Sequence, residues 1–266
     1  MQSNMTPSNL EQGSPLNFQP VALDSCSKIA GGNTWMVDTF QMPGLRCHLF
    51  SRPSHGADAG GDIFYATACG IEAKSKFLLV DTVGHGEEAS VLSSQLLDVL
   101  GPVADRPCNK DMLIDLNAML CESTAVSIFA TASAATFNRD EKSLTYAYAG
   151  HPNMLLHRDG EWNELRPAGE STFPVGIICN TPYHQTKTSL HPGDWVLMYS
   201  DGVLDVAGQS TGTYTPASLV RLASRIATRR SEIFFQEFLF LLATENQGTH
   251  FDDDVTFILI EVSEAI

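Results

Sequence analysis

The sequence predicts an α+β fold in which strands and helices form separate layers. Strand-like runs follow one another through the middle of the chain, and helical patterns occur in pairs before and after them. Regular alternation of strands and helices would instead have indicated a doubly wound parallel sheet. The chain has 266 residues, 43% of them hydrophobic, so it is long enough to bury a large core.

The chain is expected to consist of a tail and one domain. Residues 1–20 are polar and rich in Ser, Asn, Gln and Pro, which is typical of a flexible segment. They lack the basic start and apolar run of a signal peptide. Residues 21–266 carry the strand and helix patterns, and we expect them to form a single folded domain.

The elements of this domain follow from the spacing of its apolar residues. Apolar or alternating runs between turn residues predict strands at 47–51, 63–69, 76–81, 127–137, 144–149, 154–157, 162–165, 183–190, 195–199 and 255–262. Apolar residues that recur every three or four positions predict helices at 87–100, 111–121, 216–228 and 231–244. Gly101-Pro102 should end the first helix. The strands between 127 and 199 should form successive antiparallel hairpins.

Composition narrows the functional classes. The formal net charge of −15 argues against binding nucleic acid or an anionic membrane through a basic patch. A phosphate substrate would then need a metal to offset the repulsion. The six cysteines show no Cys-x-x-Cys spacing and are expected to be reduced thiols, not disulfides or a zinc site. No segment approaches the roughly 20 apolar residues of a membrane span, and we expect a soluble, cytoplasmic protein.

Four aspartates stand at the ends of predicted strands, each close to Gly or to another Asp: Asp62, Asp81, Asp201 and Asp253. Carboxylates that converge repel one another, so their burial together is tolerated mainly when cations lie between them. Oxygen ligands without a Cys or His cluster favour Mg²⁺ or Mn²⁺ over zinc or copper. Taken alone, however, Asp81 is equally consistent with an Asp-initiated turn before a helix.

Several motifs occur in a defined order along residues 47–262: Gly60-Gly61-Asp62, Asp81-x-x-Gly84-His85-Gly86, Leu116-Asn117, Phe129-x-Thr131-Ala132, Ala149-Gly150-His151-Pro152, Pro174-x-Gly176, Pro192-Gly193-Asp194, Tyr199-Ser200-Asp201-Gly202 and Asp253-Asp254-Val255-Thr256. Together they resemble the metal-dependent type 2C (PPM) serine/threonine phosphatases. The resemblance is closer to the bacterial SpoIIE/RsbU-like branch of that family.

The resemblance implies an α-β-β-α sandwich of two antiparallel sheets flanked by helices, with two Mn²⁺ or Mg²⁺ ions at one end. Its motif positions assign the bridging ligand to Asp81, with the backbone carbonyl of Thr82 beside it. Asp201 and Asp253 would hold the second ion, and Asp62 would bind a metal or orient its water. Around these ligands, Asp254 and Asp205 would be supporting neighbours.

The same resemblance implies hydrolysis of phosphoserine or phosphothreonine by direct attack of metal-bound water. His85 is the candidate for protonating the leaving oxygen, although its glycine neighbours also suit a purely structural turn. The implied substrate is a phosphorylated STAS-domain anti-sigma-factor antagonist in a bacterial partner-switching pathway. A protein activator would act on the helical pair at 87–121.

Two alternatives remain open. One is a catalytically silent pseudophosphatase that only binds a phosphoprotein. The other is a small-molecule metal phosphohydrolase, which would need a deep pocket lined by convergent polar groups.

Overall fold

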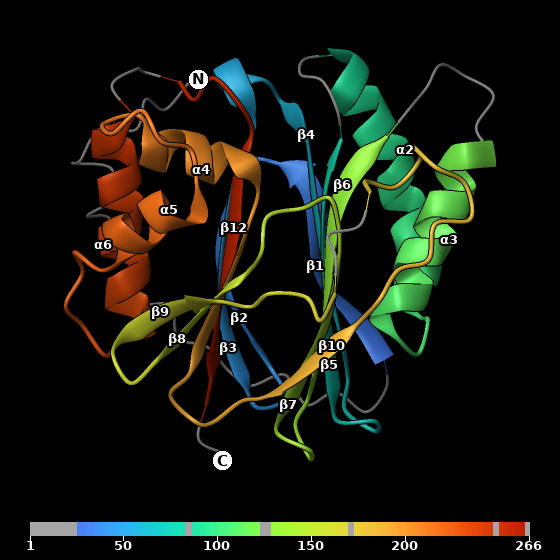
Figure 1. Cartoon of the computed structure of the whole chain (residues 1–266), viewed down its shortest axis with the longest axis horizontal. Coiled ribbons are helices and arrows are strands. Elements are labelled where there is room, and N and C mark those ends of the chain that lie inside the picture. The colour runs from blue at the N-terminus through green and yellow to red at the C-terminus, as the bar shows by residue number, and fades with distance from the viewer. Residues whose placement is uncertain (1–25, 83–86, 123–128, 170–172, 247–249, 264–266) are drawn as a thin grey trace.

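Two six-stranded antiparallel sheets face each other in the computed structural model, which describes residues 26–82, 87–122, 129–169, 173–246 and 250–263 (Figure 1). The first sheet has the order β1 (Cys26–Thr34), β4 (Ala59–Cys69), β5 (Lys74–Thr82), β6 (Ala130–Asn138), β7 (Ser143–Ala149) and β10 (Thr186–Ser189). The second has the order β2 (Met36–Met42), β3 (Leu45–Arg52), β12 (Val255–Val262), β11 (Trp195–Tyr199), β8 (Leu155–Arg158) and β9 (Glu161–Glu164).

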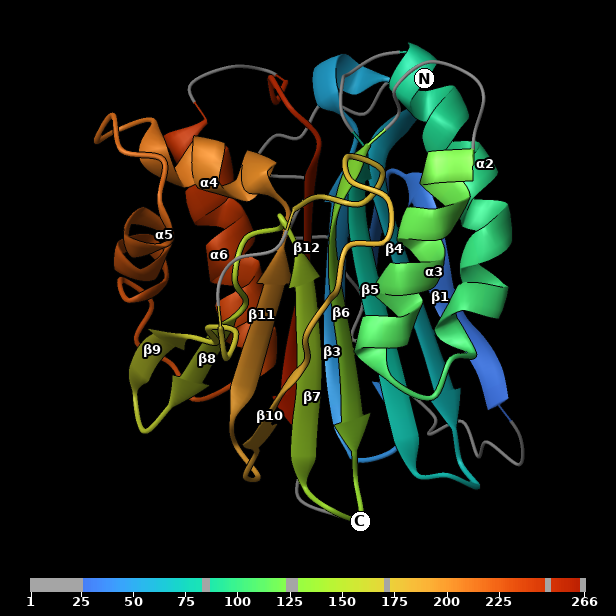
Figure 2. The same cartoon turned by 45° about the vertical axis from the view of Figure 1, so that its right-hand side comes forward.

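Helices cover the outer face of each sheet, as both Figure 1 and Figure 2 show. The first sheet carries α2 (Glu87–Ala104) and α3 (Asn109–Glu122), and the second carries α4 (Asp201–Gly208), α5 (Pro216–Ala223) and α6 (Ser231–Glu245). A short 3-10 helix, η1 (Ser54–Gly56), follows β3. The predicted α-β-β-α sandwich is therefore confirmed. No described helix is long and apolar enough to cross a membrane.

The layered fold explains why β5 has a continuous apolar run. Phe77 and Leu79 point into the core between the sheets, whereas Leu78 and Val80 pack beneath α2 and α3. Successive side chains of a strand alternate between its two faces, so a strand covered on both sides must be apolar throughout. A third cluster, which includes Phe238, fills the space between the second sheet and its helices.

Some elements differ from the sequence prediction. The first helix continues through Pro102 to Ala104. Lys76 Nζ donates to the carbonyl of Ala104, the last residue of that helix, and to that of Arg106 in the following turn, each at 2.7 Å. Strands β1 and β2 were not predicted. Both are edge strands, and β1 contains two glycines and irregular register. Helix α4 was also missed, because the short segment opens with Asp-Gly, which resembles a turn.

The predicted hairpin between residues 183–190 and 195–199 is wrong. Strand β10 pairs with β7 in the first sheet, whereas β11 pairs with β8 and β12 in the second. The connecting turn therefore crosses between the layers. Asp194 holds this turn in place: its carboxylate accepts hydrogen bonds from the His191 backbone N–H at 2.7 Å and from Arg158 Nε at 3.0 Å.

The cysteine prediction is wrong for one pair. A disulfide joins Cys121, near the end of α3, to Cys179, with a Cα–Cα distance of 5.8 Å. The two are 58 residues apart, so only the folding of the later segment over α3 brings them together. The Asn117 side chain fixes the same contact, since its Nδ2 donates to Ile178 O at 3.1 Å. Among the described cysteines, Cys47, Cys69 and Cys108 form no disulfide.

Candidate metal centre

The predicted aspartate ligands lie at one end of the sandwich, where elements of both sheets meet. Asp62 on β4 and Asp81 on β5 are directly opposite each other in the first sheet. Asp201 is the first residue of α4, immediately after β11, and Asp253 lies just before β12 in the second sheet. Segments remote in sequence thus bring four carboxylates to one place, at the end drawn uppermost in Figure 1.

These carboxyl groups are crowded enough to perturb one another. Burial raises the pKa of Asp81 to about 8, and the charges of Asp201 and Asp253 add to the shift. The side chains of Asp81 and Asp201 interact directly, which raises the pKa of Asp81 and opposes the rise in the pKa of Asp201. The pKa of Asp201 is itself raised, by loss of hydration within the crowded cleft and by Asp253, although its side chain remains exposed. Carboxyl groups crowded in this way suit a bound cation.

Asp62 gives an independent sign of a missing positive group. Its side chain is buried, and Oδ2 has no hydrogen-bond partner. Burial and then the charge of Asp81 raise the pKa of Asp62 well above its usual range, although hydrogen bonds with Ser200 and Thr256 oppose the shift. A buried carboxylate oxygen without a partner is costly, and a bound cation would satisfy it.

The donor set fits a hard divalent cation, because it consists of carboxylate oxygens from Asp62, Asp81, Asp201 and Asp253. In the parts of the chain that the structure describes, no three His, Cys, Asp or Glu side chains already surround a common point. The carboxylates would therefore have to turn toward an ion.

Asp254 is held differently from its neighbour Asp253. Its carboxylate is buried and accepts the backbone N–H groups of Ser54 at 2.6 Å and Gly61 at 2.5 Å. A Cβ atom at Gly60 would lie 2.7 Å from the same carboxylate. The Gly60-Gly61 pair is thus required for close approach to Asp254, and Asp254 in turn positions the strand that carries Asp62.

The remaining predicted residues have distinct surroundings. Thr82 is buried at the end of β5, and its hydroxyl donates to Gly61 O at 3.1 Å. Asp205 is exposed one turn after Asp201, and partial loss of hydration, then the charges of Asp253 and Asp252, raise its pKa. His85 lies outside the described residues. The ligand and catalytic roles of all these residues stay predictions.

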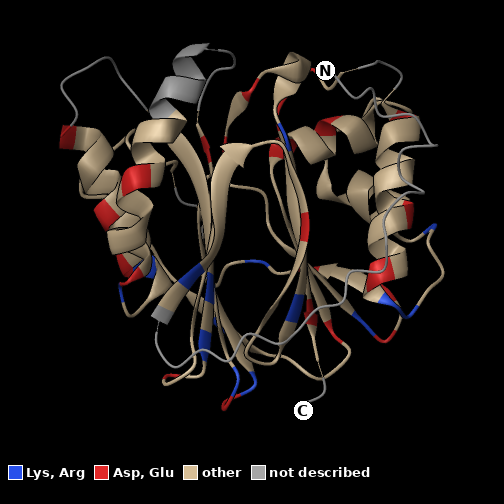
Figure 3. Cartoon of the chain, turned by 180° about the vertical axis from the view of Figure 1, so that it is seen from behind, with Lys and Arg blue, Asp and Glu red and all other residues tan. Residues whose placement is uncertain are grey.

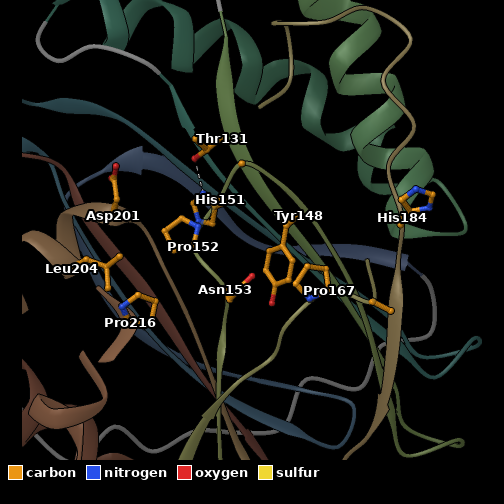
Figure 4. A pocket seen from close by; sticks show the side chains of 12 residues that line it. Thr131, Tyr148, His151, Pro152, Asn153, Pro167, His184, Asp201, Leu204 and Pro216 are labelled. Atoms are coloured by element: carbon orange, nitrogen blue, oxygen red, sulfur yellow. Dashed lines mark hydrogen bonds between the residues drawn. The ribbon is translucent and has the colours of Figure 1, made fainter. Parts of the chain in front are cut away.

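A cleft of about 390 Å³ opens beside Asp201 and was not predicted as part of the site (Figure 4). Its inner wall includes Thr131 and His151, whose side chains are hydrogen-bonded through Thr131 Oγ1 and His151 Nδ1 at 2.7 Å. Burial lowers the pKa of His151 to about 4, so the ring is neutral near pH 7. The Gly-His-Pro motif, which the sequence offered only as part of the family resemblance, gives no sign of the cleft by itself.

Comparison with known proteins identifies relatives that match most of the chain. The family model for Stage II sporulation protein E (SpoIIE) matches residues 72–263. Phosphoserine phosphatase RsbU from Bacillus subtilis (strain 168) is 25% identical over 187 residues, which cover 68% of this chain and 54% of RsbU. The chain therefore spans about half the length of this curated relative.

Solved structures show the same fold. The RsbU and RsbW domains of a Mycobacterium tuberculosis protein superpose with a TM-score of 0.71 at 24% identity, over 88% of this chain and 64% of that chain. The PP2C phosphatase domain of SpoIIE from Bacillus subtilis gives 0.66 at 18% identity, over 87% and 65%. RsbX in complex with magnesium gives 0.64 at 17% identity, over 86% and 100%.

Proposed function

The chain belongs to the SpoIIE family of PP2C-like proteins, and from this premise we propose that it is a metal-dependent phosphatase acting on phosphoserine or phosphothreonine in a protein. The observation that carries the proposal is the contact between Asp81 and Asp201. It joins the end of β5 in the first sheet to the start of α4 behind the second. Carboxyl groups brought together in this way are suited to holding divalent cations.

In this proposal each aspartate has a defined task. Asp81, with the backbone carbonyl of Thr82, would help to hold both Mn²⁺ or Mg²⁺ ions, and Asp201 and Asp253 would hold the second. Asp62 would bind an ion or orient water. Bound ions would activate water and neutralise charge on the phosphoryl oxygens. The magnesium complex of the related RsbX is consistent with such a site.

Other residues near the candidate centre would support the ligands without binding an ion themselves. Asp254 accepts a hydrogen bond from Gly61 and so positions the strand that carries Asp62. Asp205 borders a second cleft, which Asp252 and Asp253 also line. His85 stays a candidate for protonating the leaving oxygen. His151 is unsuited to that role because its ring nitrogens pair with Thr131 and with Tyr199 O.

We further propose a phosphorylated STAS-domain protein as the substrate, with a protein activator that acts on α2 and α3. The similarity to RsbU supports this assignment. A domain with this substrate would work in the bacterial cytoplasm. The cleft beside Asp201 does not favour a small-molecule phosphohydrolase, because Thr131, Tyr148 and His151 in its wall are already paired within the protein.

The test is hydrolysis of an aryl phosphate and of a phosphorylated STAS protein, with Mn²⁺ and with a chelator. We expect Mn²⁺-dependent turnover that falls at least about a hundredfold in Asp201→Asn, because an amide replaces a charged ligand. Asp140→Asn, in the exposed β6–β7 turn, is the matched control and should retain turnover. Equal turnover in Asp201→Asn would contradict the proposed centre, and Mn²⁺ binding without turnover would indicate a pseudophosphatase.

A further inference from the structure

The cleft beside Asp201 is built from strands of the first sheet, from helices α4 and α5, and from the connections between strands. Thr131 comes from β6, Tyr148 from β7, and Leu204 from α4, while Pro167 and Ala168 follow β9. Figure 4 shows Asp201 and His184 on opposite sides of this space. The cleft therefore continues directly from the candidate metal centre.

The polar side chains of the inner wall, Thr131, Tyr148 and His151, are already hydrogen-bonded within the protein. The His151 Nε2–H donates to the backbone oxygen of Tyr199 at 3.1 Å, which leaves Nδ1 to accept from the Thr131 hydroxyl. The Tyr148 hydroxyl donates to Leu165 O at 2.8 Å and accepts from the Met154 N–H at 3.1 Å. A ligand could engage these groups only by breaking existing hydrogen bonds.

The other surfaces of the wall are mainly apolar. Pro152, Pro167 and Pro216 have no backbone N–H to donate, and Leu204 and Ala168 add aliphatic surface. Against these surfaces a polar ligand group would lose its hydration without gaining a partner, whereas an apolar group would gain free energy by leaving water. Two further polar side chains line the cleft: Asn153, whose Nδ2 donates to Glu164 Oε2 at 3.3 Å, and His184, which is exposed and lies across the cleft from Asp201 (Figure 4). The chemistry of the wall selects an apolar occupant.

We propose that this cleft binds an apolar side chain of the phosphoprotein substrate, close in sequence to its phosphorylated residue. The inference rests on the proposed function, because Asp201 at the mouth would help to place the phosphate. An extended peptide advances about 3.3 Å per residue, so the occupant should lie within about two residues of the phosphoserine. The cleft would thus determine which substrate residue is preferred next to the phosphoserine.

The first test uses the unmodified protein and phosphoserine peptides that differ at one flanking position. Peptides with Leu, Ala or Lys there are compared by kcat/KM with Mn²⁺, and by fluorescence anisotropy of labelled peptides. We expect the Leu peptide to exceed the Ala and Lys peptides about tenfold in kcat/KM and to bind more tightly, because its side chain becomes buried.

The second test changes the wall without disturbing the core. Ala168 is exposed, and its backbone N–H, not its side chain, makes the hydrogen bond to Thr186 Oγ1 at 2.8 Å. In Ala168→Glu the Leu-to-Lys ratio of kcat/KM should fall at least about tenfold, because the new carboxylate opposes an apolar occupant and attracts lysine. Ala243→Glu, at an exposed position of α6, is the matched control and should keep the ratio.

Failure of the inference can be distinguished from failure of the proposed function. Equal kcat/KM for the three peptides, or preference for Lys, would overturn the apolar subsite even if aryl phosphate is hydrolysed with Mn²⁺. An unchanged ratio in Ala168→Glu would overturn it as well. Absence of Mn²⁺-dependent aryl phosphate hydrolysis would remove the phosphatase assignment, and the subsite with it.

Discussion

At the scale of single residues, one buried aspartate, Asp254, explains why several positions in the motifs must be glycine. Asp254 accepts backbone hydrogen bonds from Ser54 and Gly61, and a side chain at Gly60 would collide with it. A side chain at Gly202 would collide with the backbone oxygen of Asp254. The glycines beside two predicted ligands, Asp62 and Asp201, are therefore needed for packing, independently of any metal.

His48 is a second residue whose setting has a measurable consequence. It is buried, with Nδ1 paired with Thr39 Oγ1 at 2.9 Å and Nε2 with Ser231 Oγ at 3.1 Å. Its ring also stacks on Phe235. Burial lowers the pKa of His48 to about 4. The native protein therefore keeps this histidine neutral at pH values where an unfolded chain would protonate it.

This difference predicts a loss of stability in acid. Between the unfolded pKa of about 6.5 and the folded pKa of about 4, the unfolded state binds the proton and the native state does not, so stability falls as pH falls. At about pH 5 the loss from His48 should be roughly 2 kcal/mol. The free energy of unfolding, measured with urea at about pH 7.5 and pH 5, should fall less in His48→Gln than in the unmodified protein. An equal change in the variant would contradict the assignment.

At the scale of elements, α3 anchors a segment that belongs to no helix or sheet. Residues 176–179 lie along α3 through the two hydrogen bonds of Asn117 and through the Cys121–Cys179 disulfide. Helix α2 is tied to the candidate centre in a different way. The Ser93 hydroxyl donates to Gly60 O at 2.6 Å and accepts from Asn33 Nδ2 at 2.8 Å. Both helices thus contact segments that border the site.

The disulfide should stabilise the oxidised domain by restricting the unfolded chain. Its two cysteines are 58 residues apart, and closing a loop of that length is worth about 2–4 kcal/mol. Urea unfolding of Cys179→Ser should show this loss relative to the oxidised protein. Cys108→Ser is the control, because Cys108 is a free thiol that is not fully buried. If a reducing agent lowers the stability of the unmodified protein and Cys179→Ser equally, the disulfide contributes nothing.

At the scale of the whole molecule, the candidate centre joins the two layers of the sandwich. Its predicted ligands come from β4 and β5 on one side and from α4 and the turn just before β12 on the other. Figure 3 shows Lys and Arg gathered mainly near the opposite end of the strands. The acidic end therefore has few basic side chains to offset its charge, and only the folded chain assembles the site.

Metal binding should therefore raise thermal stability. A ligand at about a hundred times its Kd stabilises the native state by about 2.7 kcal/mol, which for a chain of this size raises Tm by roughly 5–10 °C. We expect this shift with Mn²⁺ in the unmodified protein and in Asp140→Asn. It should be largely absent in Asp201→Asn. A full shift in Asp201→Asn would place the bound Mn²⁺ elsewhere.

The sequence by itself determined the local features of this protein. The apolar run of β5, the strand β12 at Val255–Val262 and the aspartates at strand ends were all predictable, because period and turn chemistry depend on neighbouring residues. The ordered motifs also indicated the family. Local sequence patterns could not indicate the edge strand β1. Its composition favours a strand only weakly, and its pairing with β4 decides its structure.

Tertiary structure decided which of these local features meet. It separated β10 from β11, paired Cys121 with Cys179, and gave the adjacent residues Asp253 and Asp254 different surroundings. It also created the cleft beside Asp201 from strands of the first sheet and helices that cover the second. The physical reason is that burial, carboxylate repulsion and hydrogen-bond pairing act between residues distant in the chain. Their partners are fixed only when the layers pack.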